Sequence, residues 1–147
     1  MVRLEGRGAR RILLAVAVLA TAHPVGAAEG FKVIVNAKLA GAAVPKETVA
    51  DIYLGRVKRW RDGRPIAAVD LPSGSPVRIV FSATVLRMTL PGVRAHWMPL
   101  LATGKRPPLV RPSDEAVTAF VAAQAGGIGY VSESAALPET VKVVTVE

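Results

Sequence analysis

The segment from Ile66 to Arg78 contains the residues best suited to bind a small anion. Its pattern is that of an apolar strand, a short polar loop and the first turn of a helix. Pro76 suits a first helical turn, where the N–H that proline lacks would be unpaired anyway, and Ser75 is a favourable N-cap residue. Helix N-termini attract anions through unpaired N–H groups and a partial positive charge. We therefore predict an anion-binding site formed by Ser73, Gly74, Ser75 and Arg78.

The same residues also have a purely structural interpretation. Ser75 is then the cap that most helices require, and Arg78 is a solvated cation. Other chemistry is scarce, because the sequence has no cysteine and His96 is its only histidine after residue 28. We therefore expect no thiol catalysis and no metal site. Neither a Ser-His-Asp order nor a paired-carboxylate spacing is present, so we predict that the protein is not an enzyme and has no cofactor.

Residues 1–28 have the three parts of a secretory signal peptide. Four arginines form a basic region, residues 12–20 are an unbroken apolar run, and residues 25–28 offer small side chains for cleavage. The alternative is an uncleaved membrane anchor, although the apolar run is short for a membrane span. We expect a periplasmic protein with no stable membrane anchor after cleavage and a single domain at residues 29–147.

The net charge falls when residues 1–28 are set aside. The full chain has a net charge of +8, whereas the part from residue 29 onward has 15 Lys and Arg against 10 Asp and Glu, or +5. A charge of this size keeps an ordinary domain soluble, and it also suits attraction of small anions or an acidic surface. We expect no nucleic-acid partner. The basic residues between positions 56 and 64 form either a solvated face or a docking surface for a protein.

Strands and helices alternate around the predicted site. Strands are predicted at residues 31–36, 66–71, 128–131 and 141–146. Helices are predicted between Pro45 and Gly55, at 77–88, at 90–102 and between Ser113 and Gly126. Strands separated by helices predict an α/β fold, a three-layer sandwich with a mixed, mostly parallel sheet.

Two of these helices carry specific packing predictions. In the helix at 77–88, an apolar stripe should face the sheet; it consists of Val77, Val80, Phe81, Val85 and Met88. In the helix at 90–102, Trp97 and Leu101 should share one side, and Pro99 should kink or end the helix. We interpret Trp60 and Trp97 as packing residues and not as ligand-stacking residues.

Three segments in this order resemble the phosphate-binding proteins of bacterial ABC transporters (PstS-like). Residues 52–63 carry Ile-Tyr-Leu-Gly, then Trp60 and Asp-Gly, and resemble an I-F-x-G-x-x-x-x-W-x-D-G segment. Residues 126–131 (Gly-Gly-Ile-Gly-Tyr-Val) resemble a P-G-(A/S)-I-G-Y-V turn, and Phe81 lies where the family has the helix after its phosphate loop. The resemblance covers residues 31–147. It implies a type 2 periplasmic-binding-protein fold, phosphate or a similar oxyanion as ligand, and an ABC permease or another envelope protein as partner.

Two departures from the family pattern modify this expectation. The Ser-Gly-Thr of the family's phosphate loop corresponds here to Ser75, Pro76 and Val77, which keeps one hydroxyl but loses a backbone donor and a second hydroxyl. The chain also resembles one lobe of the family's two-lobed proteins, a single-lobe short form. Since water screens charges in an open site, we expect weak phosphate binding. The alternative is a non-transport accessory or sensory interaction protein that keeps the fold without a tight ligand.

Overall fold

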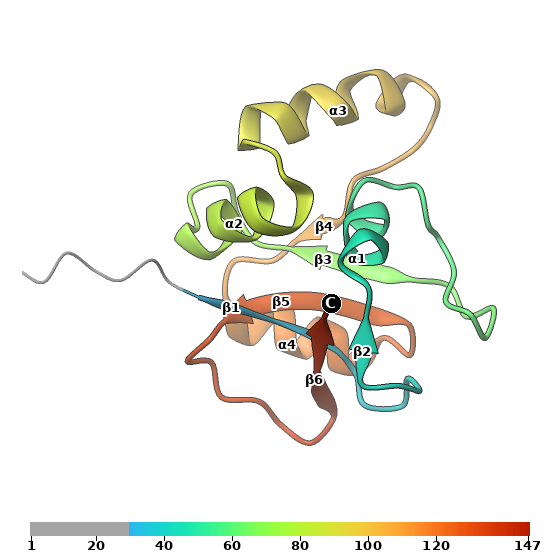
Figure 1. Ribbon diagram of the computed structural model, residues 1–147, viewed down its shortest axis with the longest axis vertical. Helices are drawn as coiled ribbons and strands as arrows, with labels where there is room; N and C mark the ends of the chain where they lie inside the picture. Colours follow the sequence, from blue (N-terminus) through green and yellow to red (C-terminus); the bar gives the residue numbers. More distant parts are fainter. Residues whose placement is uncertain (1–29) are drawn as a thin grey trace, which may run out of the picture.

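The computed structural model describes residues 30–147, so the predicted signal peptide lies outside the described residues. Six strands form one sheet in the order β2-β6-β1-β5-β3-β4 (Figure 1). The strands are β1 Phe31–Asn36, β2 Ala43–Val44, β3 Ala67–Asp70, β4 Leu109–Val110, β5 Gly127–Ser132 and β6 Val141–Val146. β1 pairs antiparallel with β5 and β6, and the other three pairings are parallel. The predicted mixed, mostly parallel sheet is confirmed.

Helices cover both faces of this sheet. They are α1 Lys46–Tyr53, α2 Pro76–Phe81, the π-helical turn η1 Ser82–Leu86, α3 Leu90–Ala102 and α4 Asp114–Ala123. On β5, Gly129 faces the valines of α4, whereas the ring of its neighbour Tyr130 stacks on Phe81 of α2 at 3.8 Å between centroids. Successive residues of a strand point to opposite faces. The sheet is therefore the middle layer of an α/β sandwich, and β5 is buried on both sides.

The helices near the predicted site begin at capped residues. Ser75 Oγ accepts a hydrogen bond from the Arg78 N–H at 3.3 Å, and Ser113 Oγ accepts one from the Ala116 N–H at 3.2 Å. Each bond satisfies one of the N–H groups that a first helical turn leaves unpaired. The N-cap predicted at Ser75 is thus present, and Ser113 caps α4 in the same way.

The helix predicted at 77–88 differs from the expectation in its second half. After six residues α2 passes into η1, and Arg87 at φ 53° ends this turn in the left-handed region. A π-helical turn widens the repeat of the helix. As a result Leu86 joins the core and Met88, which follows the turn, is only half-buried. Val80 of the predicted stripe, which precedes the turn, is also only half-buried.

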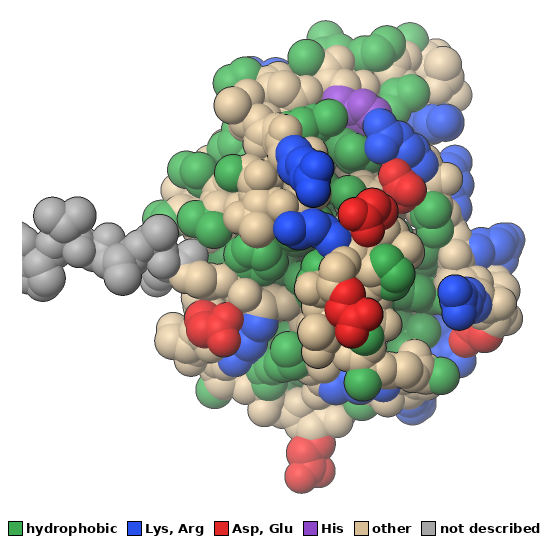
Figure 2. Space-filling view, viewed as in Figure 1, with side chains coloured by type: hydrophobic (Ala, Val, Ile, Leu, Met, Phe, Trp, Pro, Cys, Tyr) green, Lys and Arg blue, Asp and Glu red, His purple; other side chains and the backbone are tan. Residues whose placement is uncertain are grey.

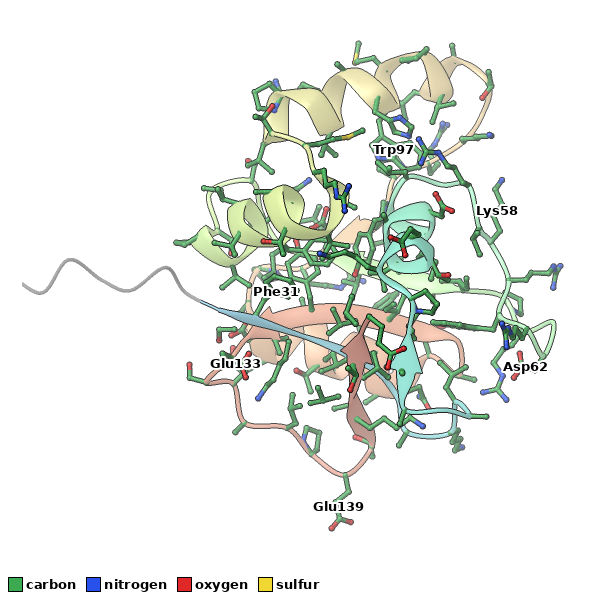
Figure 3. The ribbon with its side chains drawn as sticks, in the orientation of Figure 1. Phe31, Lys58, Asp62, Trp97, Glu133 and Glu139 are labelled. Carbon is green, nitrogen blue, oxygen red and sulfur yellow. The ribbon has the colours of Figure 1, made fainter. Side chains whose placement is uncertain are left out.

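Pro99 does not end α3 as one of the two expectations for it required, because the helix continues to Ala102. Leu101 follows Trp97 by one turn, as predicted, but it is 39% exposed whereas Trp97 is buried. Pro99 removes one helical N–H, but the carbonyl that loses this partner belongs to exposed Ala95, where water can replace it. The buried residues of α3 are Val93 and Trp97, and Figure 3 shows Trp97 between α3 and the body of the molecule.

Candidate functional site

The candidate site is built around Asp70, the last residue of β3. Its Oδ1 atom accepts hydrogen bonds from the Leu71 N–H at 2.9 Å and from the hydroxyl of Tyr130 on β5. Its Oδ2 atom lies 3.0 Å from Nη2 of Arg78. Since the Asp70 side chain is only 12% exposed, these partners replace most of the water that a carboxylate would otherwise bind.

The guanidinium of Arg78 is engaged by the protein itself. Besides its ion pair with Asp70, it donates from Nη1 to the Leu71 carbonyl at 2.8 Å. These contacts join the first turn of α2 to the end of β3. The sequence suggested a cation beside an anion site, and in the structure this cation holds the loop at 71–75 against β3.

Burial shifts the protonation equilibria of this cluster. Desolvation raises the pKa of Asp70, and the hydrogen bond from Tyr130 and the charge of Arg78 oppose this rise only in part. Burial and the neighbouring Asp70 charge raise the pKa of Tyr130, while burial raises that of Tyr53, whose hydroxyl donates to the Val69 carbonyl at 2.8 Å. Both tyrosines are therefore neutral donors. Sequence reasoning missed Asp70 as a site residue, although a carboxylate ending an apolar strand before a polar loop was a usable signal.

On the other side of the loop, a surface pocket lies between the N-termini of α2 and α4. One wall comes from the loop and α2: Leu71, Pro72, Gly74, Ser75, Pro76 and Val77. The other wall comes from the segment that caps α4 and from the end of β5: Pro112, Ser113, Asp114 and Ser132. The structure thus brings predicted Gly74 and Ser75 into one pocket. Predicted Ser73 and Arg78 instead line a neighbouring groove against α3.

The polar groups of this pocket include both donors and an acceptor. The Ser75 N–H donates to the Pro72 carbonyl at 2.9 Å. Within the described residues, the N–H groups of Gly74 and Val77 have no backbone acceptor, so they can bind solvent or a ligand. Asp114 Oδ2 accepts hydrogen bonds from the hydroxyl and, at 3.3 Å, the N–H of Ser132. Any anion in this pocket would therefore meet hydroxyl and N–H donors together with one carboxylate.

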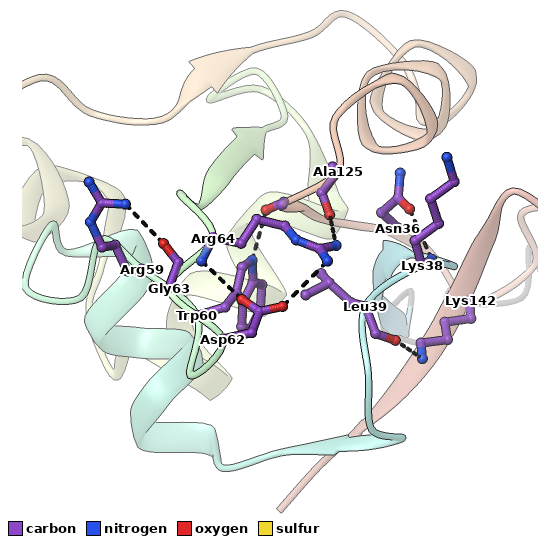
Figure 4. A network of polar contacts seen from close by, with 11 residues as sticks. Asn36, Lys38, Leu39, Arg59, Trp60, Asp62, Gly63, Arg64, Ala125 and Lys142 are labelled. Carbon is purple, nitrogen blue, oxygen red and sulfur yellow. Dashed lines mark hydrogen bonds and ion pairs between the residues drawn. The ribbon is translucent and has the colours of Figure 1, made fainter.

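The basic loop between residues 56 and 64 is largely tied to neighbouring groups (Figure 4). Arg64 lies 3.4 Å from the Asp62 carboxylate and donates to the Ala125 carbonyl at 3.0 Å. Arg56 pairs with Asp51 at 3.1 Å, and Arg59 donates to a carbonyl within the loop. These contacts fix the conformation of the loop, so the structural interpretation accounts for most of its arginines.

The motifs that carry the family resemblance make packing contacts with one another. Trp60 Nε1 donates to the Gly126 carbonyl at 3.0 Å (Figure 4). A Cβ on Gly126 would lie 1.8 Å from the Pro65 carbonyl oxygen, and one on Gly55 would lie 2.6 Å from the Trp97 ring. Close approach of chain segments therefore requires glycine at these two positions. Trp60 and Trp97 are packing residues, as the sequence indicated.

Within residues 30–147, no three His, Asp or Glu side chains lie close enough together to hold a metal ion. No helix in the same range has the length and apolar character needed to cross a membrane.

Solved structures similar to this chain include phosphate-binding proteins, whereas no family model and no curated protein matches the sequence. A phosphate ABC transporter substrate-binding protein from Clostridium perfringens, solved with bound phosphate, has a TM-score of 0.64 and 19% identity over 80% of this chain. An ABC-type phosphate transport receptor from Vibrio cholerae has a TM-score of 0.61 and 20% identity over 79% of this chain. PstS from Borrelia burgdorferi has a TM-score of 0.63 and 13% identity over 81% of this chain.

These matches define the class of fold. The protein has a PstS-like α/β fold, as the resemblance implied. The chain spans only 45–47% of the length of these three proteins. Their ligands and partners are therefore a basis for a proposal and not a property established for this chain.

Proposed function

We propose that this protein is a solute-binding module of the phosphate ABC transporter type that binds phosphate or a similar oxyanion. The binding site is the pocket between the N-termini of α2 and α4. The observation that carries the proposal is the convergence of two capped helix starts, with the hydroxyls of Ser75 and Ser113, on one surface pocket. Helix starts and hydroxyl groups are suited to bind oxyanions.

The expected contacts are modest in number. Ser75 and the N–H groups of Gly74 and Val77 meet the anion, Ser73 extends the rim, and Arg78 positions the loop through Asp70. Because the Arg78 charge is largely balanced by Asp70 and because Gly74 is exposed, the site is open and binding is weak. Dissolved salt screens such contacts, so affinity falls as ionic strength rises.

Asp114 gives this site a preference among oxyanions. One of its oxygens accepts from Ser132, and the carboxylate lines the pocket. A carboxylate repels a fully deprotonated anion, but it accepts a hydrogen bond from an anion that keeps a proton. Phosphate at neutral pH keeps at least one proton and sulfate keeps none. Phosphate therefore binds more tightly than sulfate in this proposal, and Asp114→Asn reduces the difference.

Titration calorimetry of the protein with phosphate and with sulfate, at low and moderate salt, tests the site. Ser75→Ala removes a pocket hydroxyl together with a helix cap. The matched control is Thr89→Ala, which removes the equivalent cap of α3, the 3.2 Å bond from Gly92, outside this pocket. We expect Ser75→Ala to weaken phosphate binding and Thr89→Ala to leave it unchanged.

Three results would contradict the proposal. They are the absence of a binding heat at millimolar phosphate, equal binding of sulfate and phosphate, and equal effects of the two cap variants. The first would favour the interaction function over solute binding. The last would place the ligand elsewhere on the protein.

The finer parts of the proposal concern location and partner. The signal-peptide pattern of residues 1–28 and the likeness to substrate-binding proteins support export to the periplasm and an ABC permease as partner. N-terminal sequencing of protein from a periplasmic fraction should find a chain that begins near residue 29. An intact Met1 on a membrane-bound product would contradict this part.

A further inference from the structure

α3 carries apolar side chains on two opposite faces. Its inward face holds Val93 and Trp97, which are buried against the rest of the protein. Positions 91, 95, 98 and 101 share its outward face and are Pro, Ala, Met and Leu, all exposed; Met98 is 61% exposed. A row of exposed apolar side chains along a helix commonly marks an interaction surface. Among residues 30–147, nothing covers the outward face of α3.

Positive charge is concentrated in the same part of the chain. The segment from Leu71 to Ser113, which holds α2, η1, α3 and β4, contains no Asp or Glu. Its cations are Arg78, Arg87, Arg94, Lys105, Arg106 and Arg111. In the rest of the described chain, basic and acidic residues are equal in number, nine of each. Figure 2 shows hydrophobic and basic side chains, and no acidic ones, over the α3 end of the molecule.

Four of these cations lie on α3 or within a few residues of its ends in the sequence. Arg87 precedes the N-cap of the helix, and Lys105 and Arg106 follow its last turn, where Arg106 donates to the Lys105 carbonyl at 3.0 Å. Arg94 lies on the helix and lines one groove together with Met98 and Leu101. The two remaining cations are engaged elsewhere, Arg78 by Asp70 and Arg111 by the ring of Phe120 at 5.2 Å.

We propose that α3 is a peripheral membrane-binding helix that lays its outward face on an anionic phospholipid surface. Its exposed apolar side chains enter the boundary between head groups and acyl chains. The long side chains of Arg94 and of the cations at the helix ends reach lipid phosphates. The position of α3 fits this contact, because the helix forms one far end of the molecule and no other helix or strand lies beyond it (Figure 1).

The size of the face favours a lipid surface over a protein partner. A helix of 13 residues is about 20 Å long and presents one side about 10 Å wide, roughly 200 Å². A stable protein interface buries about 800 Å² on each partner. A lipid surface has no such minimum area, because each apolar side chain that enters the acyl boundary and each cation that reaches a lipid phosphate adds to binding. The outward face of α3 shares no residue with the oxyanion pocket, although Ser73 and Arg78 line the groove beside α3.

The absence of cysteine from the sequence allows a local test on the full chain. Ala95→Cys provides one attachment point for an environment-sensitive fluorophore on the outward face of α3. Val143→Cys provides the control on β6, where Val143 is 49% exposed. Because the reporter is local, contact by α3 is separated from any contact by residues 1–28. The probes are vesicles of phosphatidylglycerol mixed with phosphatidylcholine and vesicles of phosphatidylcholine alone.

We expect the fluorophore at position 95 to move to shorter wavelength with the anionic vesicles only, and the fluorophore at position 143 to stay unchanged. Arg94→Glu should weaken partition about tenfold, because cations near an anionic surface each contribute to binding. Met98→Asp should remove the response at position 95, whereas Val143→Asp should preserve it. An absent response, an equal response to neutral vesicles, or one that survives both α3 variants would overturn the proposal. A response to polyglutamate but not to vesicles would assign the face to an acidic protein instead.

Discussion

The hydroxyl of Tyr130 on β5 donates a hydrogen bond to the carboxylate of Asp70 at the end of β3. The contact joins neighbouring strands of the sheet at the point where the chain turns toward α2. Arg78 completes the cluster from α2 through its ion pair with Asp70. One buried carboxylate thus holds together two strands and the helix whose first turn lines the candidate oxyanion pocket.

The raised pKa of Asp70 predicts how stability changes with pH. A folded-state pKa above the ordinary value of 3.8 means that the folded protein binds more protons than the unfolded chain over this interval. Protonation of Asp70 therefore stabilises the folded protein. This stabilisation is complete below the unfolded pKa and is lost as pH rises through the folded pKa. Asp70→Asn lacks the titration, so its stability relative to the wild type should improve from about pH 4 upward.

Urea denaturation of the wild type and Asp70→Asn at several pH values measures this difference. The amide still accepts from Tyr130 and Leu71, which makes Asn the closest substitute in shape. The opposite trend, a growing advantage of the wild type as pH rises, would mean that Arg78 and Tyr130 outweigh burial and lower the pKa of Asp70.

Phe81 should make a large contribution to stability. It is 1% exposed, its ring stacks on Tyr130, and it meets Tyr53 edge to face at 4.9 Å between centroids. Phe81→Ala leaves a cavity among these rings and should lower the free energy of unfolding by roughly 3–5 kcal/mol. Ile79→Ala on the exposed side of α2 is the matched control and should change stability by less than about 1 kcal/mol. Similar losses for both variants in a denaturant melt would show that Phe81 is not a core residue.

Gly126→Ala should be among the most damaging small substitutions in this protein. The added methyl group would lie 1.8 Å from the Pro65 carbonyl oxygen, so the backbone of one segment must move. We expect a loss of about 3 kcal/mol or more, or failure to fold. The control is Gly74→Ala, where a Cβ meets nothing within 4 Å and stability should change by no more than about 0.5 kcal/mol. Equal melting temperatures for the two variants would contradict this assignment.

Much of the fold could be predicted from the sequence because its signals are local. β1 and β6 have the predicted bounds, Ser75 and Ser113 cap the predicted helices, and the alternation of strands and helices gave the α/β class. These features depend on side-chain periodicity and on hydrogen bonds between residues a few positions apart. The two-residue strands β2 and β4 were missed, since so short a strand exists only through its neighbour in the sheet.

The candidate site also combines features that follow from the local sequence with features that only the tertiary structure determines. The sequence determined that a polar loop and a capped helix start follow an apolar strand. Gly74 and Ser75 of this loop line the pocket in the structure. Only the tertiary structure decided that Ser113, Asp114 and Ser132 form the opposite wall and that Asp70 engages the Arg78 guanidinium. It also decided which side of α3 faces outward, because both faces of that helix are apolar and local periodicity cannot distinguish them. The two walls of the pocket are about 40 to 60 positions apart in the sequence, and the Asp70–Arg78 pair depends on how α2 packs against β3. Such contacts follow from sheet order and helix packing, which no local pattern encodes.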